Sequence, residues 1–421
     1  MLTAQTIPTD AQQGKEFATQ IAERVRQARE ERAITQDQFA AALGCNDRQT
    51  ISAIETGIRR IAPEEMVRIA KILSKPVSFF TDPYVIAETS AFSYRAAPNS
   101  PDIGAFERKA HKLISASRRF RRLLGEPEAP FGNQLKGINR QTPLLAAADA
   151  GDRTAGSLGL GDTPALKLLR AAEERLSVSI LFVDAPESIS GAVCHLPDGD
   201  YVLVNRNEAS FRRNFNIGHE LFHVLTWAEM PPGRIDPVLQ GEQRPKVERL
   251  ADNFSSGLLM PLREVQGRWR ARAPEGDLHR WIIANAKDFR VSGQALYWRL
   301  VDAGLLSKTV RVDLRLLSRS DEDDGAGKPN PYSAEFARRL SAVLDRGLVS
   351  VRKAADLLEC EPHDLKGIVS AYGFNPSRSR LPWAGIQTPT RSRPSRNTSS
   401  PRRPRIWRSP CGSRPPACET C

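Results

Sequence analysis

The chain has 421 residues, which is long enough for two or three domains with well-buried cores. No apolar run approaches the ~18 residues of a membrane span, and the six cysteines form no disulfide framework, so we expect a cytoplasmic protein without a membrane partner. The net charge is +12, but ten arginines and one acid between Arg378 and Cys421 supply most of it, so bulk charge does not identify a nucleic-acid-binding fold.

Residues 17–83 are dense in helical signals. The run Thr35-Gln36-Asp37-Gln38 has the form of a capping box and predicts the start of a helix, which Gly44 ends. Residues 46–49 predict the start of the next helix, and Gly57 predicts its end. Apolar residues at helical spacing predict further helices on either side. We therefore expect a compact bundle of four or five short helices.

Two runs in this bundle resemble the phage-repressor-type (XRE) helix-turn-helix family: residues 34–44, ITQDQFAAALG, and residues 50–57, TISAIETG. One extra residue lies in the turn between them, at residues 45–48. The resemblance implies that the third helix enters the major groove of double-stranded DNA while the second helix braces it. An alternative is a helical bundle used for protein docking or dimerisation.

The side chains that this resemblance places on DNA form two groups. Arginine suits guanine and glutamine suits adenine, so one group is expected to read base edges and the other to contact phosphates. The base-reading group is Arg48, Gln49, Thr50 and Ser52, and the phosphate group is Gln36, Arg59 and Arg60.

The middle of the chain combines helical segments with a few strands. A very basic helix is predicted at residues 106–124 and an amphipathic helix at 165–176. The apolar run 179–183 predicts a strand, and the turn sequence PDGD within residues 192–205 predicts a hairpin. We therefore expect a mainly α fold with a small β-sheet.

Residues His219-Glu220-Leu221-Phe222-His223 have the pattern His-Glu-x-x-His. On a helix the two histidines lie one turn apart on the same face, so both imidazoles can bind a single Zn²⁺. Glu220 lies beside them, where it can take a proton from a metal-bound water. The alternative is a surface helix that carries two histidines by chance.

A catalytic zinc needs a third protein ligand and an open position for water. Glu248 is the candidate, because it begins a helix predicted at residues 246–260 whose apolar face can pack against the first helix. Asp252 lies one turn later and can accept a hydrogen bond from the free ring nitrogen of a histidine ligand. Taken alone, Glu248 is also an ordinary helix-start acid, which the helix dipole favours.

Two runs resemble the ImmA/IrrE metallopeptidases, small gluzincins that cleave repressor proteins. Residues 215–223, FNIGHELFH, are similar to the family's Phe-Thr-Leu-Ala-His-Glu-Leu-Gly-His, and residues 248–261, ERLADNFSSGLLMP, to its Glu-x-x-Ala-Asn-x-Phe-Ala-Ala-x-Leu-Leu-Met-Pro. The resemblance covers roughly residues 165–300. The chain departs from the family at Asp252 (Asn in the family), at residues 255–256 (Ala-Ala) and at Phe222 (Gly), but the ligand set is unchanged.

The resemblance implies metal-assisted peptide hydrolysis, with zinc held by His219, His223 and Glu248 and with Glu220 transferring the proton from water to the leaving amine. It does not identify the group that stabilises the oxyanion. His195, in the predicted hairpin, is one candidate, although a lone histidine on a strand is more often structural. That strand could also hold the substrate as an added β-strand.

The C-terminal part divides into a helical unit and a tail. The helical unit, residues 332–374, is interpreted as a lid on the peptidase rather than as a second, small helix-turn-helix. From residue 375 onward the sequence is rich in Pro and Arg without periodicity, and we expect disorder. The tail binds nucleic acid or is an unselected extension from a shifted reading frame, and the sequence leaves both open.

The sequence thus predicts a modular regulator. We expect a homodimeric transcriptional regulator that binds a double-stranded DNA operator and whose zinc endopeptidase cleaves a repressor, either itself or a partner. One alternative is a non-catalytic regulator that uses the metallopeptidase fold as a sensor or dimerisation module. Another is a structural zinc, which is disfavoured because structural sites normally have four protein ligands. The predicted segments are a flexible leader (1–16), an XRE-type helix-turn-helix domain (17–83), a helical linker region (84–164), an α+β gluzincin-like metallopeptidase domain (165–315), the C-terminal helical unit (332–374) and the disordered tail (375–421).

Overall fold

The structure is a computed structural model. It describes residues 10–45, 47–82, 92–94, 101–126, 135–196, 198–231, 244–310, 312–319 and 327–374. The tail expected to be disordered, residues 375–421, lies outside the described residues. Among the described helices, none is both long enough and apolar enough to cross a membrane.

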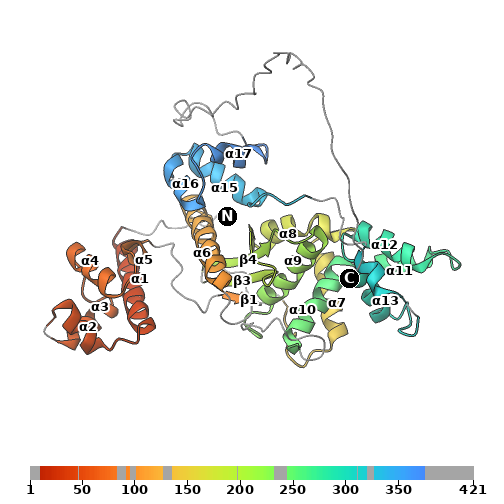
Figure 1. Ribbon diagram of the computed structural model, residues 1–421, viewed down its shortest axis with the longest axis horizontal. Helices are drawn as coiled ribbons and strands as arrows, with labels where there is room; N and C mark the ends of the chain where they lie inside the picture. The colour runs from red at the N-terminus through yellow and green to blue at the C-terminus, as the bar shows by residue number, and fades with distance from the viewer. Residues whose placement is uncertain are drawn as a thin grey trace, which may run out of the picture. The chain divides into compact units, whose positions relative to one another are not determined.

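The N-terminal bundle consists of five helices (Figure 1): α1 (Asp10–Glu31), α2 (Gln36–Leu43), α3 (Arg48–Glu55), α4 (Pro63–Ile72) and α5 (Val77–Thr81). The predicted capping box at the start of α2 is confirmed, because Gln38 N donates to Thr35 Oγ1 at 3.2 Å and Thr35 N donates to Gln38 Oε1 at 2.9 Å. Gly44 ends α2 in the left-handed region, with φ at 78°. Apolar faces of the helices enclose one core, which includes Phe39 and Ile51.

The start of α1 differs from expectation. The flexible leader predicted at residues 1–16 overlaps this helix, because residues 10–16 are helical in the structure, while residues 1–9 lie outside the described residues. Their sequence contains Ala, Gln, Lys and Glu, which are good helix formers, so the helix continues through them.

The sheet has four strands among the described residues, in the order β1-β3-β4-β2. The predicted hairpin is formed by β3 (Gly191–Leu196) and β4 (Gly199–Asn205), which pair antiparallel. The predicted strand β2 (Ser179–Val183) runs parallel to β4. Strand β1 (Phe92–Tyr94) pairs antiparallel with β3 and was not predicted, because three residues are too few for a periodic pattern.

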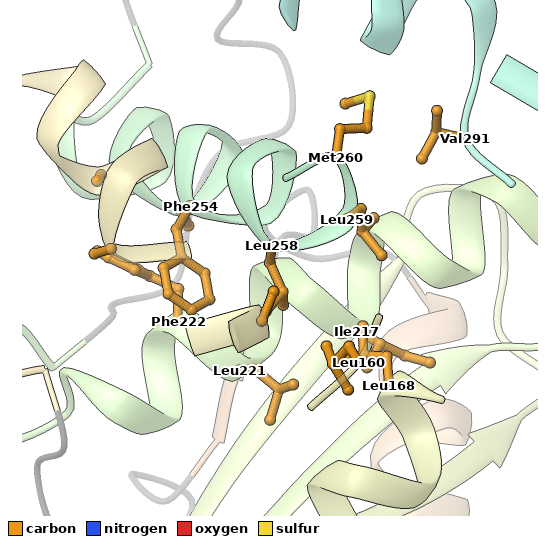
Figure 2. Close-up of a cluster of buried hydrophobic side chains, with 14 of the residues drawn as sticks. Leu160, Leu168, Ile217, Leu221, Phe222, Phe254, Leu258, Leu259, Met260 and Val291 are labelled. Carbon is orange, nitrogen blue, oxygen red and sulfur yellow. The ribbon is translucent and has the colours of Figure 1, made fainter. Parts of the chain in front are cut away.

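Helices α9 (Ser210–Leu225) and α10 (Lys246–Leu259) form the centre of the domain. α9 packs against β3 and β4, and α10 packs against α9. Figure 2 shows the apolar side chains between them, where the rings of Phe222 and Phe254 lie 5.5 Å apart. The remaining helices of the domain are α7 (Leu144–Ser157), α8 (Leu168–Arg175), α11 (Leu262–Arg270), α12 (Leu278–Phe289), α13 (Gly293–Asp302) and α14 (Leu314–Arg319).

Helix α7 packs unusually close to α10 because glycine stands at the contact on both helices. A Cβ atom on Gly257 would lie 1.9 Å from the carbonyl oxygen of Ala148, and one on Gly151 would lie 2.1 Å from that of Phe254. Helix α7, which falls in the predicted helical linker region (84–164), therefore packs into the same core as α9 and α10. The sequence did not indicate that α7 belongs to this core, because the helix consists largely of small residues and has no strong apolar stripe.

The C-terminal helical unit comprises α15 (Ala334–Asp345), α16 (Val351–Leu358) and α17 (Asp364–Ser370). Helices α15 and α16 pack against α6 (Pro101–Leu123), the predicted basic helix, which begins before the expected residue 106. Ser333 caps α15 by accepting from Phe336 N at 3.1 Å, and its hydroxyl donates to Glu173 Oε1 of α8 at 2.5 Å. The unit is thereby joined to both α6 and α8.

Glu173 is expected to make this junction sensitive to pH. Burial raises the pKa of its carboxyl from 4.5 to about 7, against the opposing hydrogen bond from Ser333 and charge of Arg339. Because the pKa in the folded state is the higher one, the stabilisation is complete below the unfolded value and is lost as pH rises through about 7.

Glu173→Gln keeps an acceptor for Ser333 and cannot ionise. We expect the variant to match the wild type in urea unfolding at pH 4, below the unfolded pKa of 4.5, and to be more stable by roughly 1–3 kcal/mol at pH 8. The same stability difference at both pH values would contradict this assignment.

Candidate metal centre

Helix α9 carries His219, Glu220 and His223 on its buried side. Ile217 and Leu221 anchor the helix in the core, which turns both histidines toward α10. The two imidazole rings meet edge to face with centroids 4.9 Å apart, and their Nε2 atoms are 3.2 Å apart. The one-turn spacing therefore brings both rings to one point, as the sequence predicted.

Glu248, in the first turn of α10, completes the group. Its side chain is 1% exposed, with Oε2 3.3 Å from His219 Nε2 and Oε1 3.2 Å from His223 Nε2. The ligand atoms of His219, His223 and Glu248 all lie within 4.8 Å of one another. The structure thus brings together the three residues that the sequence singled out, from two helices that pack side by side.

This donor set fits a zinc ion. Two imidazole nitrogens and a carboxylate are ligands found in catalytic zinc sites. Burial opposes ionisation of Glu248, but the hydrogen bonds and charges of His219 and His223 outweigh it and hold the pKa of that carboxyl far below its usual range. A buried anion that faces two converging imidazole nitrogens offers its lone pairs to a cation.

Asp252 and Arg244 support the group from the side. Asp252 Oδ1 lies 2.9 Å from His219 Nδ1, the contact that the sequence predicted, so Nε2 is the nitrogen left to face Glu248. Arg244 Nη1 donates to Asp252 Oδ2 at 2.6 Å, and its Nη2 lies 3.8 Å from Glu248 Oε2. Sequence reasoning missed Arg244, because it lies in a loop and matches no motif.

Glu220 lies against β3 at a position without a side chain. A Cβ atom on Gly191 would lie 2.8 Å from Glu220 Oε1 and 3.1 Å from its Cγ. The absence of a side chain at Gly191 therefore gives the Glu220 carboxylate its room. The sequence did not indicate a role for Gly191, because that role depends on helix α9, which packs over it in the folded chain.

Two of the residues that differ from the ImmA/IrrE motif, Phe222 and Ser255, make specific contacts between α9 and α10. Phe222 is fully buried and packs on Phe254, so it fills space between α9 and α10 behind the histidines. Ser255 Oγ donates to the carbonyl of Phe215 at 2.8 Å, which ties α10 to α9. Gly218 makes room for that hydroxyl, since a Cβ there would lie 2.5 Å from Ser255 Oγ.

His195, the candidate for oxyanion stabilisation, has partners of its own. Its Nδ1 lies 2.5 Å from Oδ1 of the buried Asp200, the residue opposite it on β4. Its ring stacks on Trp227, which follows α9, with centroids 5.0 Å apart. The three residues link the hairpin to the end of α9, and this arrangement accounts for His195 without a role in chemistry.

The residues expected to contact DNA lie on α2, α3 and the turn after α3. Arg48 and Gln49 are exposed, whereas Thr50 and Ser52 are half-buried. Gln36 bridges two helices of the bundle, because its Oε1 accepts from Arg48 Nε at 2.9 Å and its Nε2 donates to Glu55 Oε2 at 2.8 Å. The network fixes α2 relative to α3.

Ion pairs that depend on the tertiary fold were not found from the sequence. Arg29 Nε donates to the buried Glu55 at 2.6 Å, which joins α1 to α3. Arg59 Nη1 lies 2.9 Å from both carboxylate oxygens of Glu65, although Arg59 is exposed, as Arg60 is. Of the two arginines expected at phosphates, Arg59 thus has an internal partner.

Comparison with known families agrees with both halves of this description. Residues 25–80 match the helix-turn-helix family model, and residues 173–301 match the peptidase M78 model, the IrrE N-terminal-like domain. The chain joins a helix-turn-helix DNA-binding domain to an IrrE-like domain. The IrrE-like match includes the whole candidate metal centre, and its family is of the metallopeptidase type. Searches of curated proteins and of solved structures gave no significant match.

Proposed function

We propose that the chain is a cytoplasmic transcriptional regulator whose IrrE-like domain is a zinc endopeptidase that cleaves a repressor protein, either another copy of this chain or a partner. The proposal rests on the buried convergence of His219, His223 and Glu248 beside Glu220. Structural zinc normally has four protein ligands, whereas three ligands leave a coordination position for the reaction.

In this proposal His219, His223 and Glu248 hold the zinc. The bound ion would lower the pKa of a coordinated water toward 7 from about 15.7 and polarise the scissile carbonyl. Asp252 keeps Nε2 of His219 directed at the ion and raises its basicity, and Arg244 holds Asp252 in that position.

Glu220 is the proposed general base. Its carboxylate takes a proton from the attacking water and delivers a proton to the amine as the C–N bond breaks. The side chain is mostly buried and lies over Gly191, so packing limits the positions that its carboxylate can take. A fixed base near the attacking water lowers the entropic part of the barrier.

The helix-turn-helix domain directs this activity to DNA. We propose a homodimer that presents α3 of each copy to the major groove of an operator half-site. The proposed base-reading residues are Arg48, Gln49, Thr50 and Ser52, and the proposed phosphate contacts are Gln36, Arg59 and Arg60.

A comparison of wild-type protein with Glu220→Gln tests the proposed function. The variant keeps all three ligands, so it should bind about one zinc like the wild type while cleavage falls about 10²–10⁴-fold. Proteome-wide mass spectrometry of cells that produce each protein should find repressor fragments in the wild type alone. If both proteins gave identical fragments, the proposed peptidase activity would be contradicted, and the chain would be a regulator without it.

Gly191→Ala tests how closely Glu220 must be positioned. The new Cβ would meet the flexible end of Glu220, so the fold and zinc content should be unchanged while the carboxylate is displaced. A shift of this kind should lower kcat by about 10–100-fold. The measurement is steady-state cleavage at matched zinc content and melting temperature, and a fully active variant would contradict the positioning role.

A further inference from the structure

A cavity apart from the metal centre lies where α6, the C-terminal helical unit and the ends of β2 and β4 meet. α6 packs on α16 and on β2 around it. We call it the small cavity, because its volume of about 290 Å³ lies at the lower end of the ~300–1,000 Å³ of ligand pockets. A space of this size encloses a small molecule and excludes a folded partner.

The inner wall of the small cavity is apolar. Leu113, Phe182 and Leu358 line it and are buried. Cys360 adds a half-buried thiol. Burial, followed by two neighbouring carboxylates, raises the pKa of this thiol from 9.0 to about 11, so it carries no charge at neutral pH. Such a wall stabilises an aliphatic or aromatic group by removing it from water.

The mouth of the small cavity carries more positive than negative charge. Its cations are Lys109, Lys112 and Arg206, and its anions are Asp184 and Glu359. These side chains are 18–52% exposed, so they lie on the solvent side of the buried apolar wall. Among the described lining residues, three cations stand against two carboxylates, which leaves one positive charge unbalanced. A monoanion neutralises that charge, whereas a phosphate monoester, with about −1.5 to −2 charge at pH 7, exceeds it.

Asp184 is shared by three cations. Its Oδ2 lies 3.3 Å from Lys109 Nζ. Its Oδ1 lies 2.5 Å from Lys328 Nζ and 3.4 Å from Arg206 Nε. Burial opposes ionisation of Asp184, but these cations outweigh it and lower the pKa of the carboxyl. Among the described residues, the buried Nε of Arg206 has no hydrogen-bond acceptor. A second carboxylate in the cavity supplies both the missing charge and an acceptor for this guanidinium.

We propose that the small cavity binds a small organic monocarboxylate, with its carboxylate held by Lys109 and Arg206 at the mouth and its aliphatic or aromatic body against the apolar wall. Charge-assisted hydrogen bonds from lysine and arginine are roughly twice as strong as neutral ones, so the carboxylate selects the class of ligand. The apolar area that the body buries supplies the rest of the affinity. The site lies outside the metal centre, so the inference does not depend on the proposed cleavage.

Residues 205–208 connect the small cavity with the side of the metal centre. Arg206 lines the small cavity, whereas its neighbours Asn205 and Asn207 line a larger cavity of about 1270 Å³, whose wall also includes Asp252. A ligand that holds Arg206 therefore acts on a segment that both cavities share. Occupancy should restrain residues 205–208, which gives the chain a means to sense the carboxylate beside the metal centre.

Isothermal titration calorimetry of the full chain with sodium octanoate tests the proposal. Octanamide has the same body without the charge, acetate has the charge without the body, and octyl phosphate carries the larger charge. We expect one octanoate per chain, with a Kd at least about tenfold lower than that of each of the other three compounds. Octanoate that binds no more tightly than octanamide or acetate would overturn the proposal.

A charge variant locates the bound octanoate. Lys109→Gln removes one of the two proposed carboxylate donors, and because this side chain is 44% exposed, the fold should be unaffected. The Kd of octanoate should rise about tenfold. Lys287→Gln makes the same chemical change at an exposed position of α12, outside the small cavity, and should leave the Kd unchanged. Equal Kd values for these two variants would place octanoate elsewhere and overturn the proposal.

Cys360 reports occupancy without any substitution in the chain. Its thiol lines the small cavity, so bound octanoate should make its alkylation by N-ethylmaleimide several-fold slower, as measured by peptide mass spectrometry. Cys45, half-buried in the N-terminal bundle, is the internal control and should react at the same rate with and without octanoate. Unchanged alkylation of Cys360 at saturating octanoate would overturn the assignment of the site.

Amide hydrogen exchange tests the connection to the metal side. With octanoate bound, exchange at residues 205–208 should become slower, whereas exchange in α3 should not change. Unchanged exchange at residues 205–208 would overturn the sensing role. All of these measurements use metal-free protein, so loss of the proposed peptidase function would not alter their outcome.

Discussion

Replacement of Glu248 by glutamine is expected to weaken zinc binding by more than about 100-fold, the upper end of what loss of an outer partner costs. The carboxylate is buried between His219 and His223, and its charge is what balances the cation there. An amide of the same shape keeps the packing and removes the charge. Competition titration with a chelator of known affinity measures the change, and cleavage should be lost with the metal.

Two further variants show whether the loss of zinc affinity is specific to Glu248. Asp252 is an outer partner that contacts His219 and, through Arg244, lies beside Glu248, so Asp252→Asn should weaken zinc binding by about 10–100-fold. Glu275→Gln makes the same chemical change as Glu248→Gln at an exposed site and should leave the affinity unchanged. Zinc affinity that is equal in all three variants would mean that the metal binds elsewhere in the chain.

Gly257→Ala is expected to give the largest loss of stability from a single methyl group. The added Cβ would lie 1.9 Å from the carbonyl oxygen of Ala148, and a backbone atom cannot rotate away. The helices must separate, at a cost of about 3 kcal/mol or more, which outweighs the ~1 kcal/mol that alanine gains over glycine in a helix. The melting temperature should fall by roughly 5–10 °C.

Gly267→Ala is the matched control for this prediction. Gly267 lies within helix α11, and a Cβ there would meet nothing within 4 Å. The substitution should leave stability unchanged or raise it by up to ~1 kcal/mol. Because α10 carries Glu248, Gly257→Ala should also weaken zinc binding, whereas the control should not. Equal melting temperatures for both variants would contradict the close contact between α7 and α10.

The parts of the structure that could be predicted from the sequence are those set by local periodicity or by a spaced motif. The capping box before α2, the hairpin of β3 and β4, and the helices that carry His219 and Glu248 follow from neighbouring residues alone. The convergence of His219, His223 and Glu248 could be predicted because the helical repeat fixes the first two and the spacing of the motifs indicates the third.

The parts that were missed depend on contacts between distant segments. Gly191 matters because α9 packs over it, and Arg244 matters because α10 turns Asp252 toward it. Helix α7 packs closely on α10 because Gly151 and Gly257 lie at their contact, and glycine contributes nothing to an apolar pattern in the sequence. The pairing of β1 with β3 joins residues about a hundred positions apart, and no local pattern indicates it.

X-ray absorption at the zinc edge, on the full chain loaded with one equivalent of zinc, tests the central claim most directly. Two imidazoles and a carboxylate predict a first shell of nitrogen and oxygen at about 2.0–2.2 Å, with imidazole scattering beyond it. The competing ligands in this chain are cysteine thiolates, among them the closely spaced Cys411, Cys418 and Cys421. A sulfur shell at about 2.3 Å would assign the zinc to thiolates and contradict a metal centre between α9 and α10.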